Sequence, residues 1–523
     1  MSMRCPAIFL LFLPFFQMLC GQGSAGFAPP TSYREQLEER GAVREISLQE
    51  AITTALRGNL EIEIEDYNRG LAKAGVVSAN SYYAPIAAMN ASILSNDVPT
   101  TSLLQSGTFG SLISHSWSIA PSIQENLPGG GTATVTVNMN RMSTNSDYSL
   151  VNPAYGSTIG VTVTQPLWRG FRRTAAERQI VIARLNERMD EGQFRQRVSG
   201  IVEQVINAYW RLMITIESYE AQRQSWSVAS AEYEQARKGG DAAAMASQRS
   251  DVASHEQSLT HAAVQIIQAS NALKRLLARS IMDPVWNAGL ICSDRPDFQE
   301  SSVSLDEAVK TALERRPELE QLRLQIKQSD AEVRFDKQET KPTVNLRLEA
   351  LSAGSAGTIT ELLPPSALAP YGGLGTAYRQ VLTFQHPSVA AGLELRLPLR
   401  NTAARSQLES AVIGTRKLET QLRAAQEDIM VDTRNAWEMI AVQRKNVEAA
   451  GFSRSAAEGR LAAETKSRGA QENLEVLRDR RNLAEARVRE WQALIDHRLS
   501  QVSLQRAMNT LLDEQQIVLA RRK

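Results

Sequence analysis

The chain has 523 residues, and its 58 Lys and Arg balance 57 Asp and Glu. This balance excludes binding to nucleic acid or to an anionic membrane surface through a strong overall charge. No segment beyond the amino terminus has the roughly 18 to 20 consecutive apolar residues of a membrane-spanning helix, so a mature chain that crosses a membrane must do so as strands.

The amino terminus has the pattern of a secretory signal. Arg4 precedes an apolar stretch at residues 7–16, and the small residues Gly23, Ser24 and Ala25 follow as a cleavage site. We predict that residues 1–25 are a signal peptide and that residues 26–46 form an N-terminal tail. Cys20 leaves lipidation open as a minor alternative, because the preceding Leu19 is bulky for such a cleavage site.

The rest of the chain contains an internal repeat. SLQEAI from Ser47 matches SLDEAV from Ser304 at an offset of 257 residues, which also places Pro85 on Pro342. QPLWR at 165–169 then matches LPLRN at 397–401 at an offset of 232, so the first half carries 25 extra residues. We predict repeat 1 at 47–279, a linker or equatorial region at 280–303, repeat 2 at 304–512 and a C-terminal tail at 513–523.

Each half opens with a helix signal. Ser47 and Ser304 stand where an N-cap belongs, and a glutamate follows three residues later in both, which forms a capping box. We expect a helix from each cap to just before Pro85 or Pro342, because proline disfavours helix in the residue before it.

Strands follow these prolines. Apolar and polar residues alternate around 89–93, 157–167, 343–349 and 389–397, which predicts four strands with one apolar and one polar face. The extra residues of the first half contain a further hairpin at about 112–140, with PGGG at 128–131 as turn material. This hairpin either forms an external cap above the membrane or enlarges the barrel; we expect the cap, because the second half has no counterpart.

Long helices then return in both halves. Residues 170–238 and 401–468 have helical periodicity without an interior proline, and each predicts a helix roughly 100 Å long. Glycines at 239–240 and 469 end them, and shorter returning helices run to about 279 and 512. The predicted fold class is therefore mixed α/β and mainly α.

Strands with an apolar and a polar face suit an outer-membrane barrel, in which every backbone polar group must be paired. Four strands cannot close a barrel alone, so the barrel must be shared between copies of the chain. A soluble sandwich is the alternative for the strands. The long helices favour the barrel, because they are far longer than the globular mean of about 11 to 12 residues and have only each other to pack on.

These segments, in this order, resemble the TolC-like outer-membrane efflux proteins. The resemblance rests on the duplicated SLxEA starts, the proline before each first strand, QPLWRG at 165–170 and the helix hairpin before LEVL at 474–477. It implies a homotrimer that gives four strands per protomer to a twelve-stranded barrel in outer-membrane lipid, continuous with an α-helical coiled-coil tunnel across the periplasm of a Gram-negative bacterium.

The resemblance also implies a function. The chain would be the outer-membrane channel of a tripartite efflux or type I secretion system, a passive exit duct for substrates driven by an inner-membrane transporter. A periplasmic adaptor, or membrane fusion protein, would join the two. The runner-up is a periplasmic adaptor or structural coiled-coil protein, which would not need strands with two chemically different faces.

Relatives narrow the periplasmic tip with two acidic residues, six and nine positions after the glycine of the second hairpin. Counted from Gly469, these positions hold Glu475 and Arg478, so only the first acid is retained. Three copies of Glu475 around an axis would attract cations, whereas Arg478 could pair with Glu475 or with Asp479. The alternative is that Glu475 is one more charge on a solvated helix face.

Two further groups of residues follow from the resemblance. Candidate contacts for the adaptor, which otherwise only end helices, are Gly239, Gly240, Arg468 and Gly469. Candidate transitions between barrel and helices are Pro85, Pro166, Gly170, Pro342 and Pro398.

The sequence gives little support for catalysis. His255 and His261 are six residues apart and so lie on different faces of a helix, unlike the pair four apart in a zinc site. Beyond the signal only Cys292 remains, which excludes a disulfide framework and a metal site built on thiolates. We expect no enzyme activity, no cofactor, no metal and no nucleic-acid partner.

Overall fold

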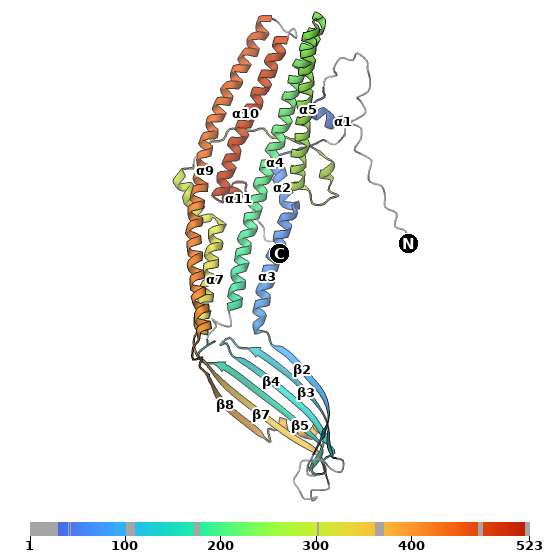
Figure 1. Cartoon of the computed structure of the whole chain (residues 1–523), viewed down its shortest axis with the longest axis vertical. Helices are drawn as coiled ribbons and strands as arrows, with labels where there is room; N and C mark the ends of the chain where they lie inside the picture. Colours follow the sequence, from blue (N-terminus) through green and yellow to red (C-terminus); the bar gives the residue numbers. More distant parts are fainter. Residues whose placement is uncertain are drawn as a thin grey trace, which may run out of the picture.

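The computed structural model describes residues 30–39, 41, 43–100, 110–171, 178–300, 303–360, 371–468 and 474–517. The predicted signal peptide and Cys20 lie outside these residues. The molecule is long and mainly helical, with one sheet at one end and two helical hairpin tips at the other (Figure 1).

Both predicted helix starts are confirmed. The side chain of Ser47 accepts a hydrogen bond from the backbone N–H of Glu50 at 3.2 Å, and Ser304 accepts one from Glu307 at 3.3 Å. The expected continuous helix after each cap is wrong, however. In the first half it divides into α2 (Leu48–Gly58) and α3 (Leu60–Asn80).

The second half breaks at the equivalent place. Its helices are α6 (Leu305–Arg315) and α7 (Pro317–Glu339), and the break residue Arg316 lies 257 positions after the break residue Asn59. Pro317 disfavours helix at Arg316, whereas the side chain of Asn59 caps α3 by accepting from Glu61 N–H at 2.9 Å. A local signal for a new helix start was present in both halves.

The long helices form two antiparallel hairpins. In the first, α4 (Arg178–Gly239) runs for 62 residues and α5 (Ala242–Leu277) returns. In the second, α9 (Thr402–Arg468) runs for 67 residues and α10 (Leu474–Ala507) returns, followed by the short α11 (Leu511–Glu514). At 1.5 Å per residue, α4 and α9 are roughly 90 to 100 Å long, as predicted.

The N-terminal tail and the linker between the repeats fold together. The tail contributes α1 (Tyr33–Glu39) and β1 (Val43–Ile46), and the linker contributes the 3₁₀ turn η2 (Pro284–Asn287) and β6 (Gly289–Cys292). β1 and β6 pair in parallel. They cover the main hydrophobic core, which α2, α4, α5 and α10 build at mid-height of the molecule.

The sheet at the other end has six antiparallel strands in the order β2-β3-β4-β5-β7-β8. The first repeat supplies β2 (Ile86–Pro99), β3 (Ser111–Asn126), β4 (Thr132–Thr144) and β5 (Val151–Pro166). The second supplies β7 (Thr343–Ile359) and β8 (Pro387–Arg396). Between these two, α8 (Leu374–Leu382) packs on β7 and β5.

The expected four strands and the expected external cap are both wrong. β3 pairs with β2 from Ile86↔Gln124 to Pro99↔Ser111, and β4 pairs with β5 from Thr132↔Thr164 to Met142↔Ala154. The extra hairpin is therefore inserted in the sheet over the full length of its neighbours (Figure 1). Apolar and polar residues alternate in β3 and β4 with the same phase as in β2 and β5. Pairing therefore satisfies the backbone N–H and C=O groups of the hairpin and keeps most of its apolar residues on the apolar face of the sheet.

Candidate functional site

The two faces of the sheet differ in chemistry in rows of paired residues near the helices. One row on the apolar face runs through Ile123, Val135, Val161, Ala350 and Val389. The adjacent row on the polar face runs through Gln124, Thr134, Thr162, Glu349 and Ala390. This pattern is the one that a wall between lipid and water requires.

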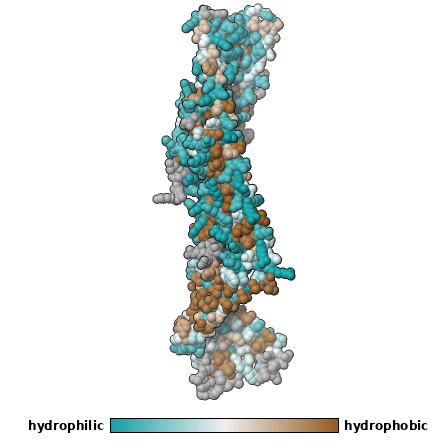
Figure 2. All heavy atoms as spheres, turned by 90° about the vertical axis from the view of Figure 1, so that its left-hand side faces the viewer, coloured by the Kyte–Doolittle hydropathy of each residue, from teal (hydrophilic) through white to brown (hydrophobic). Residues whose placement is uncertain are grey.

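The apolar face is exposed in a single copy of the chain. Ile93 on β2 is 90% exposed and Val389 on β8 is 83% exposed. Figure 2 shows hydrophobic residues gathered at the sheet end next to the helices, whereas the far end of the helical part is largely hydrophilic. An exposed apolar surface of this kind marks contact with lipid or with protein.

The sheet has two long unpaired edges. Among the described residues, β2 and β8 each pair on one side only, and every residue of both strands is exposed. With six antiparallel strands, the two edge strands run in opposite directions, so β8 of one copy can pair antiparallel with β2 of another. Edges of this length are otherwise a liability for aggregation.

The helical part also has two free edges. Successive contacts place α3, α4, α7 and α9 in that order, so α3 and α9 lie on opposite sides (Figure 1). α3 exposes a stripe with the four- and three-residue spacing of a coiled-coil seam, formed by Leu60, Ile64, Tyr67 and Leu71. α9 exposes the apolar residues Ile413, Val431, Met439, Val442 and Phe452.

The predicted transition residues lie at the junction of sheet and helices. Pro85 and Pro342 each stand directly before a strand, and Pro166 ends β5. Gly170 has φ +82°, a left-handed conformation that favours glycine, in the turn after β5. Pro398 follows the end of β8 by two residues.

The predicted tip of the first hairpin is an exposed turn. Gly239 is the last residue of α4, and Gly240 has φ +72°, the left-handed conformation that ends many helices. Asp241 then caps α5 by accepting from the N–H groups of Ala243 and Ala244 at 3.0 and 3.3 Å. At the second tip, Arg468 is the last residue of α9, while its side chain and Gly469 lie outside the described part.

Arg478 links the two hairpins near this tip. Its Nε donates to Glu232 Oε1 on α4 at 2.8 Å, and its Nη1 donates to Glu475 Oε1 one helical turn away at 3.0 Å. The pairing with Glu475 was one of the two predicted from the sequence; Asp479 follows on the same helix, half-buried. Glu232 was missed, because it belongs to the other repeat and no motif includes it.

Further ion pairs hold α9 to α10 below the tip. Arg454 on α9 contacts Glu490 on α10 at 2.6 Å and Glu458 on its own helix at 2.7 Å. Arg487 on α10 reaches Glu458 at 3.4 Å. These ion pairs join the two helices of the second hairpin to each other, whereas Arg478 joins this hairpin to the first.

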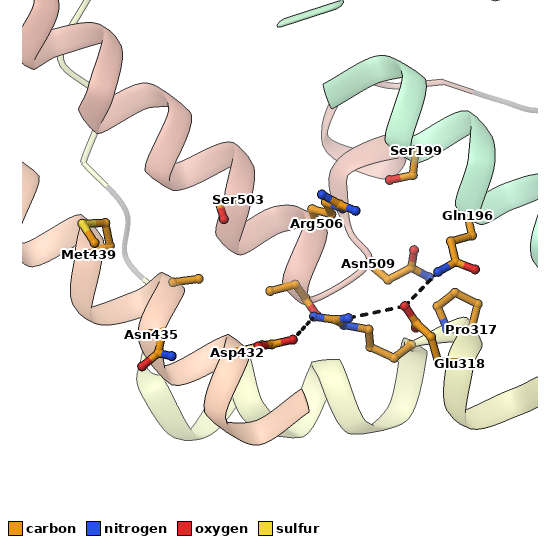
Figure 3. Close-up of a pocket in the computed structure, with 13 residues that line it drawn as sticks. Gln196, Ser199, Pro317, Glu318, Asp432, Asn435, Met439, Ser503, Arg506 and Asn509 are labelled. Carbon is orange, nitrogen blue, oxygen red and sulfur yellow. Dashed lines mark hydrogen bonds and ion pairs between the residues drawn. The ribbon is translucent and has the colours of Figure 1, made fainter. Parts of the chain in front are cut away.

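A polar joint lies where α7 begins, between α4, α9 and α10 (Figure 3). Arg316 is nearly buried there and donates to the carbonyl oxygen of Ala507 at 2.7 Å. It also contacts Glu318 at 3.4 Å and Asp432 at 3.9 Å, and Gln196 of α4 donates to the same Glu318 oxygen at 2.9 Å. Arg316 and Glu318 Oε1 thus link α4, α7, α9 and α10 in a structural joint between the repeats, while Glu318 Oε2 is buried there without a hydrogen-bond partner among the described residues.

Two partly buried titratable groups lie at mid-height of the molecule. Burial, with the nearby charge of Glu220, raises the pKa of Glu217 to about 7, and Arg295 partly opposes this. Burial, with the nearby charge of Asp294, raises the pKa of the Cys292 thiol to about 12. Neither group lies near the tip or the sheet.

Neither a metal site nor a membrane-spanning helix is found among the described residues. Within them, no group of three or more His, Cys, Asp and Glu side chains could hold a metal ion. No helix in the same residues is both long and apolar enough to cross a membrane.

The comparisons with known proteins point to one fold. No protein-family model matches the chain, and no curated protein matches it. Several solved structures of outer-membrane channels match the structure of this chain.

The CmeC outer-membrane channel of Campylobacter jejuni is 13% identical, with TM-score 0.62, over 89% of this chain and 86% of that one. The open state of the MtrE outer-membrane channel of Neisseria gonorrhoeae is 15% identical, with TM-score 0.57, over 89% of each chain. The outer-membrane protein VceC of Vibrio cholerae is 14% identical, with TM-score 0.58, over 88% of this chain and 95% of that one. The resemblance to TolC-like outer-membrane channels is confirmed: the chain has the fold of these channels, although its sheet has six strands in place of the four expected.

Proposed function

We propose that the chain is the outer-membrane channel of a tripartite efflux or type I secretion system. The observation that carries this proposal is a sheet with one apolar and one polar face, joined directly to helices roughly 90 to 100 Å long. In this arrangement the sheet crosses the outer membrane of a Gram-negative bacterium, and the helices extend into the periplasm as a passive duct. The role requires no catalytic chemistry.

The duct is a homotrimer in this proposal. The free edges of β2 and β8 and the apolar stripes of α3 and α9 lie on opposite sides of the protomer, which supports a ring closed head to tail. Each contact would bury a stripe and pair a strand edge at the same time. The number three comes from the resemblance to TolC-like proteins.

The hairpin tips are the proposed contacts for a periplasmic adaptor, which in turn joins an inner-membrane transporter. Gly239 and Gly240 form an exposed turn at the end farthest from the sheet, which supports such a contact. Arg468 and Gly469 are proposed for the second tip on the basis of the sequence.

The proposed gate lies just below these tips. Glu475 and Asp479 supply negative charge to the narrowing, and Arg478 partly neutralises it. Because Arg478 also bonds Glu232 on the other hairpin, the same side chain resists separation of the hairpins. Opening then requires the bond between Arg478 and Glu232 to break.

Cell fractionation tests the proposed function. We expect the mature protein in the outer membrane, as a trimer whose mobility on gels changes after heating. Recovery in the soluble periplasm would instead favour the alternative, a periplasmic adaptor or structural coiled-coil protein.

A further inference from the structure

The inserted hairpin changes the number of strands that one chain contributes. Ile93 of β2 lies opposite Trp117 of β3, which lies opposite Arg141 of β4, which lies opposite Tyr155 of β5. The hairpin therefore separates β2 from β5 completely. No row of the described sheet joins the two directly.

The hairpin is also fixed at the junction with the helices. Gln165 Nε2 at the end of β5 donates to the carbonyl oxygen of Gly129 in the hairpin turn at 3.0 Å. Gly130 has φ +83°, and a Cβ there would meet the carbonyl oxygen of Gly170 at 2.3 Å. The turn between β3 and β4 thus packs against the chain where β5 leaves the sheet.

We propose, resting on the proposed trimer, that the hairpin is a wall element and that three protomers close an eighteen-stranded barrel. Barrel diameter grows roughly linearly with strand number, so this barrel is about 1.5 times as wide as one with four strands per protomer. The insertion adds no helix. The widening is therefore confined to the membrane end of the duct.

The lining supplied by the hairpin indicates what the extra width is for. Its polar-face residues carry hydroxyl, amide or apolar groups and no charge. They include serines at 114, 116, 118 and 122 on β3, and threonine or asparagine at 132, 134, 136, 138 and 140 on β4. The charged residues of this face lie on β7 and β8 and balance one another as the pairs Arg347 with Glu349 and Arg396 with Glu394. Such a wall does not sort ions by charge, so the barrel admits cargo by width.

Distances between symmetry-related spin labels test the proposal. Deletion of residues 101–144 joins Thr100 to Asn145 and leaves β2 and β5 connected at the same end of the sheet. Labels at Thr162→Cys on β5 should be about 1.5 times farther apart in the full chain than in the deletion variant, because barrel diameter follows strand number. Labels at Ser453→Cys on the exposed face of α9 are the matched control and should not move.

Equal Thr162 distances in the two proteins would overturn the proposal, and so would a dimer, which closes only twelve strands. If the protein were not found as an oligomer in the outer membrane, that result would contradict the proposed function itself. It would be seen before any distances are compared. The outcomes of the two proposals are therefore distinguishable.

Cross-linking in the full-length protein covers the case in which the deletion variant does not assemble. The hydroxyl groups of Ser92 and Ser118 lie 2.9 Å apart, and Thr134 lies opposite Thr162. The double variants S92C/S118C and T134C/T162C should each form a disulfide within one chain in the assembled trimer. Failure of both pairs to cross-link would place the hairpin outside the wall.

Discussion

Tyr209 and Trp437 make the same hydrogen bond in the two halves of the chain. The hydroxyl of Tyr209 on α4 donates to the carbonyl oxygen of Ile46 at 3.1 Å, and the indole N–H of Trp437 on α9 donates to that of Val303 at 2.9 Å. Ile46 and Val303 each stand directly before the serine that caps the first helix of their half. Each long helix is thus anchored to the start of its own repeat.

Removal of the Tyr209 hydroxyl should destabilise the protein. This hydroxyl also lies 2.8 Å from Asp294 Oδ2 and accepts from the N–H of Asp294 at 3.1 Å, so Tyr209→Phe leaves that N–H without this partner and removes the bond to Ile46. We expect the free energy of unfolding to fall by about 1–3 kcal/mol. Thermal unfolding measures this as a lower midpoint, and Tyr148→Phe at an exposed tyrosine is the control. Equal midpoints for Tyr209→Phe and the parent would contradict the anchoring role.

Local signals predicted the parts of the fold that are decided locally. The caps at Ser47 and Ser304 and the alternation of the strands depend on a few neighbouring residues, and these predictions held. Pro317 is also a local signal for the break at Arg316, although the helical periodicity on both sides predicted a continuous helix. Asn59 has the equivalent position in the first repeat, so a break predicted at Arg316 would also have predicted the break at Asn59.

Tertiary contacts decided the rest. The two strands of the hairpin at 112–140 were predicted from their alternation, but their place in the sheet depends on which strands they pair with. The absence of a counterpart in the second repeat led to the wrong prediction that the hairpin lies outside the sheet as a cap. The partner of Arg478 could not be inferred, because Glu232 lies 246 residues away. The pairing of β1 with β6 likewise joins segments that share no sequence pattern.

The pH dependence of stability should carry the signature of Glu217. Its folded pKa of about 7 lies above the ordinary value of 4.5. Well below pH 4.5 the carboxyl is protonated in both states. Stability is lost as the pH rises from 4.5 through the folded pKa of about 7, because the unfolded state gives up its proton first and the folded state must then hold a partly buried charge.

Glu217→Gln removes this loss. The variant should match the parent near pH 4 and exceed its free energy of unfolding by roughly 3 kcal/mol at pH 8, at about 1.4 kcal/mol per pKa unit. Unfolding midpoints between pH 4 and pH 8 measure the difference, with the exposed Glu409→Gln as control. A difference that is the same at both pH values would exclude titration of Glu217 as its cause.

Cys292 should resist alkylation in the folded protein. Its thiol is largely buried and donates to the carbonyl oxygen of Tyr209 at 3.4 Å, and its pKa of about 12 leaves almost no thiolate near pH 8. Maleimide should label this residue only after denaturation, as measured by the mass of the mature protein. Rapid labelling of the native trimer would show that the core around β6 opens. If Cys292 does not react with maleimide, cysteines introduced elsewhere in the mature protein can be labelled selectively.

The stripe on α3 should be necessary for the oligomer. Ile64→Asp and Leu71→Asp place a carboxylate in the apolar seam proposed between protomers, which is costly to bury. We expect each variant to lower the fraction of trimer in detergent, measured by light scattering after size-exclusion chromatography. Lys73→Gln changes an exposed residue of the same helix outside the stripe and should leave the trimer intact. Trimers that persist in both Asp variants would place the interface elsewhere.

The tip should open when Arg478 loses its partner on the other hairpin. An exposed ion pair is worth at most about 1 kcal/mol, but three copies act on one ring, so Arg478→Gln should raise the open fraction by roughly ten- to a hundredfold. Conductance of the protein in planar bilayers measures this. Glu232→Gln should have the same effect, and Arg489→Gln on the same helix is the exposed control.

Charge reversal separates the bridge from other effects of these residues. The double variant Arg478→Glu with Glu232→Arg restores an attractive pair between α10 and α4, so it should recover the low conductance that either single reversal loses. Glu475→Gln addresses the remaining charge and should lower the preference for cations, because it removes one carboxylate per protomer from the proposed ring. Unchanged ion selectivity in Glu475→Gln would show that Glu475 does not line the pore. Arg478 would then act only by holding the two hairpins together.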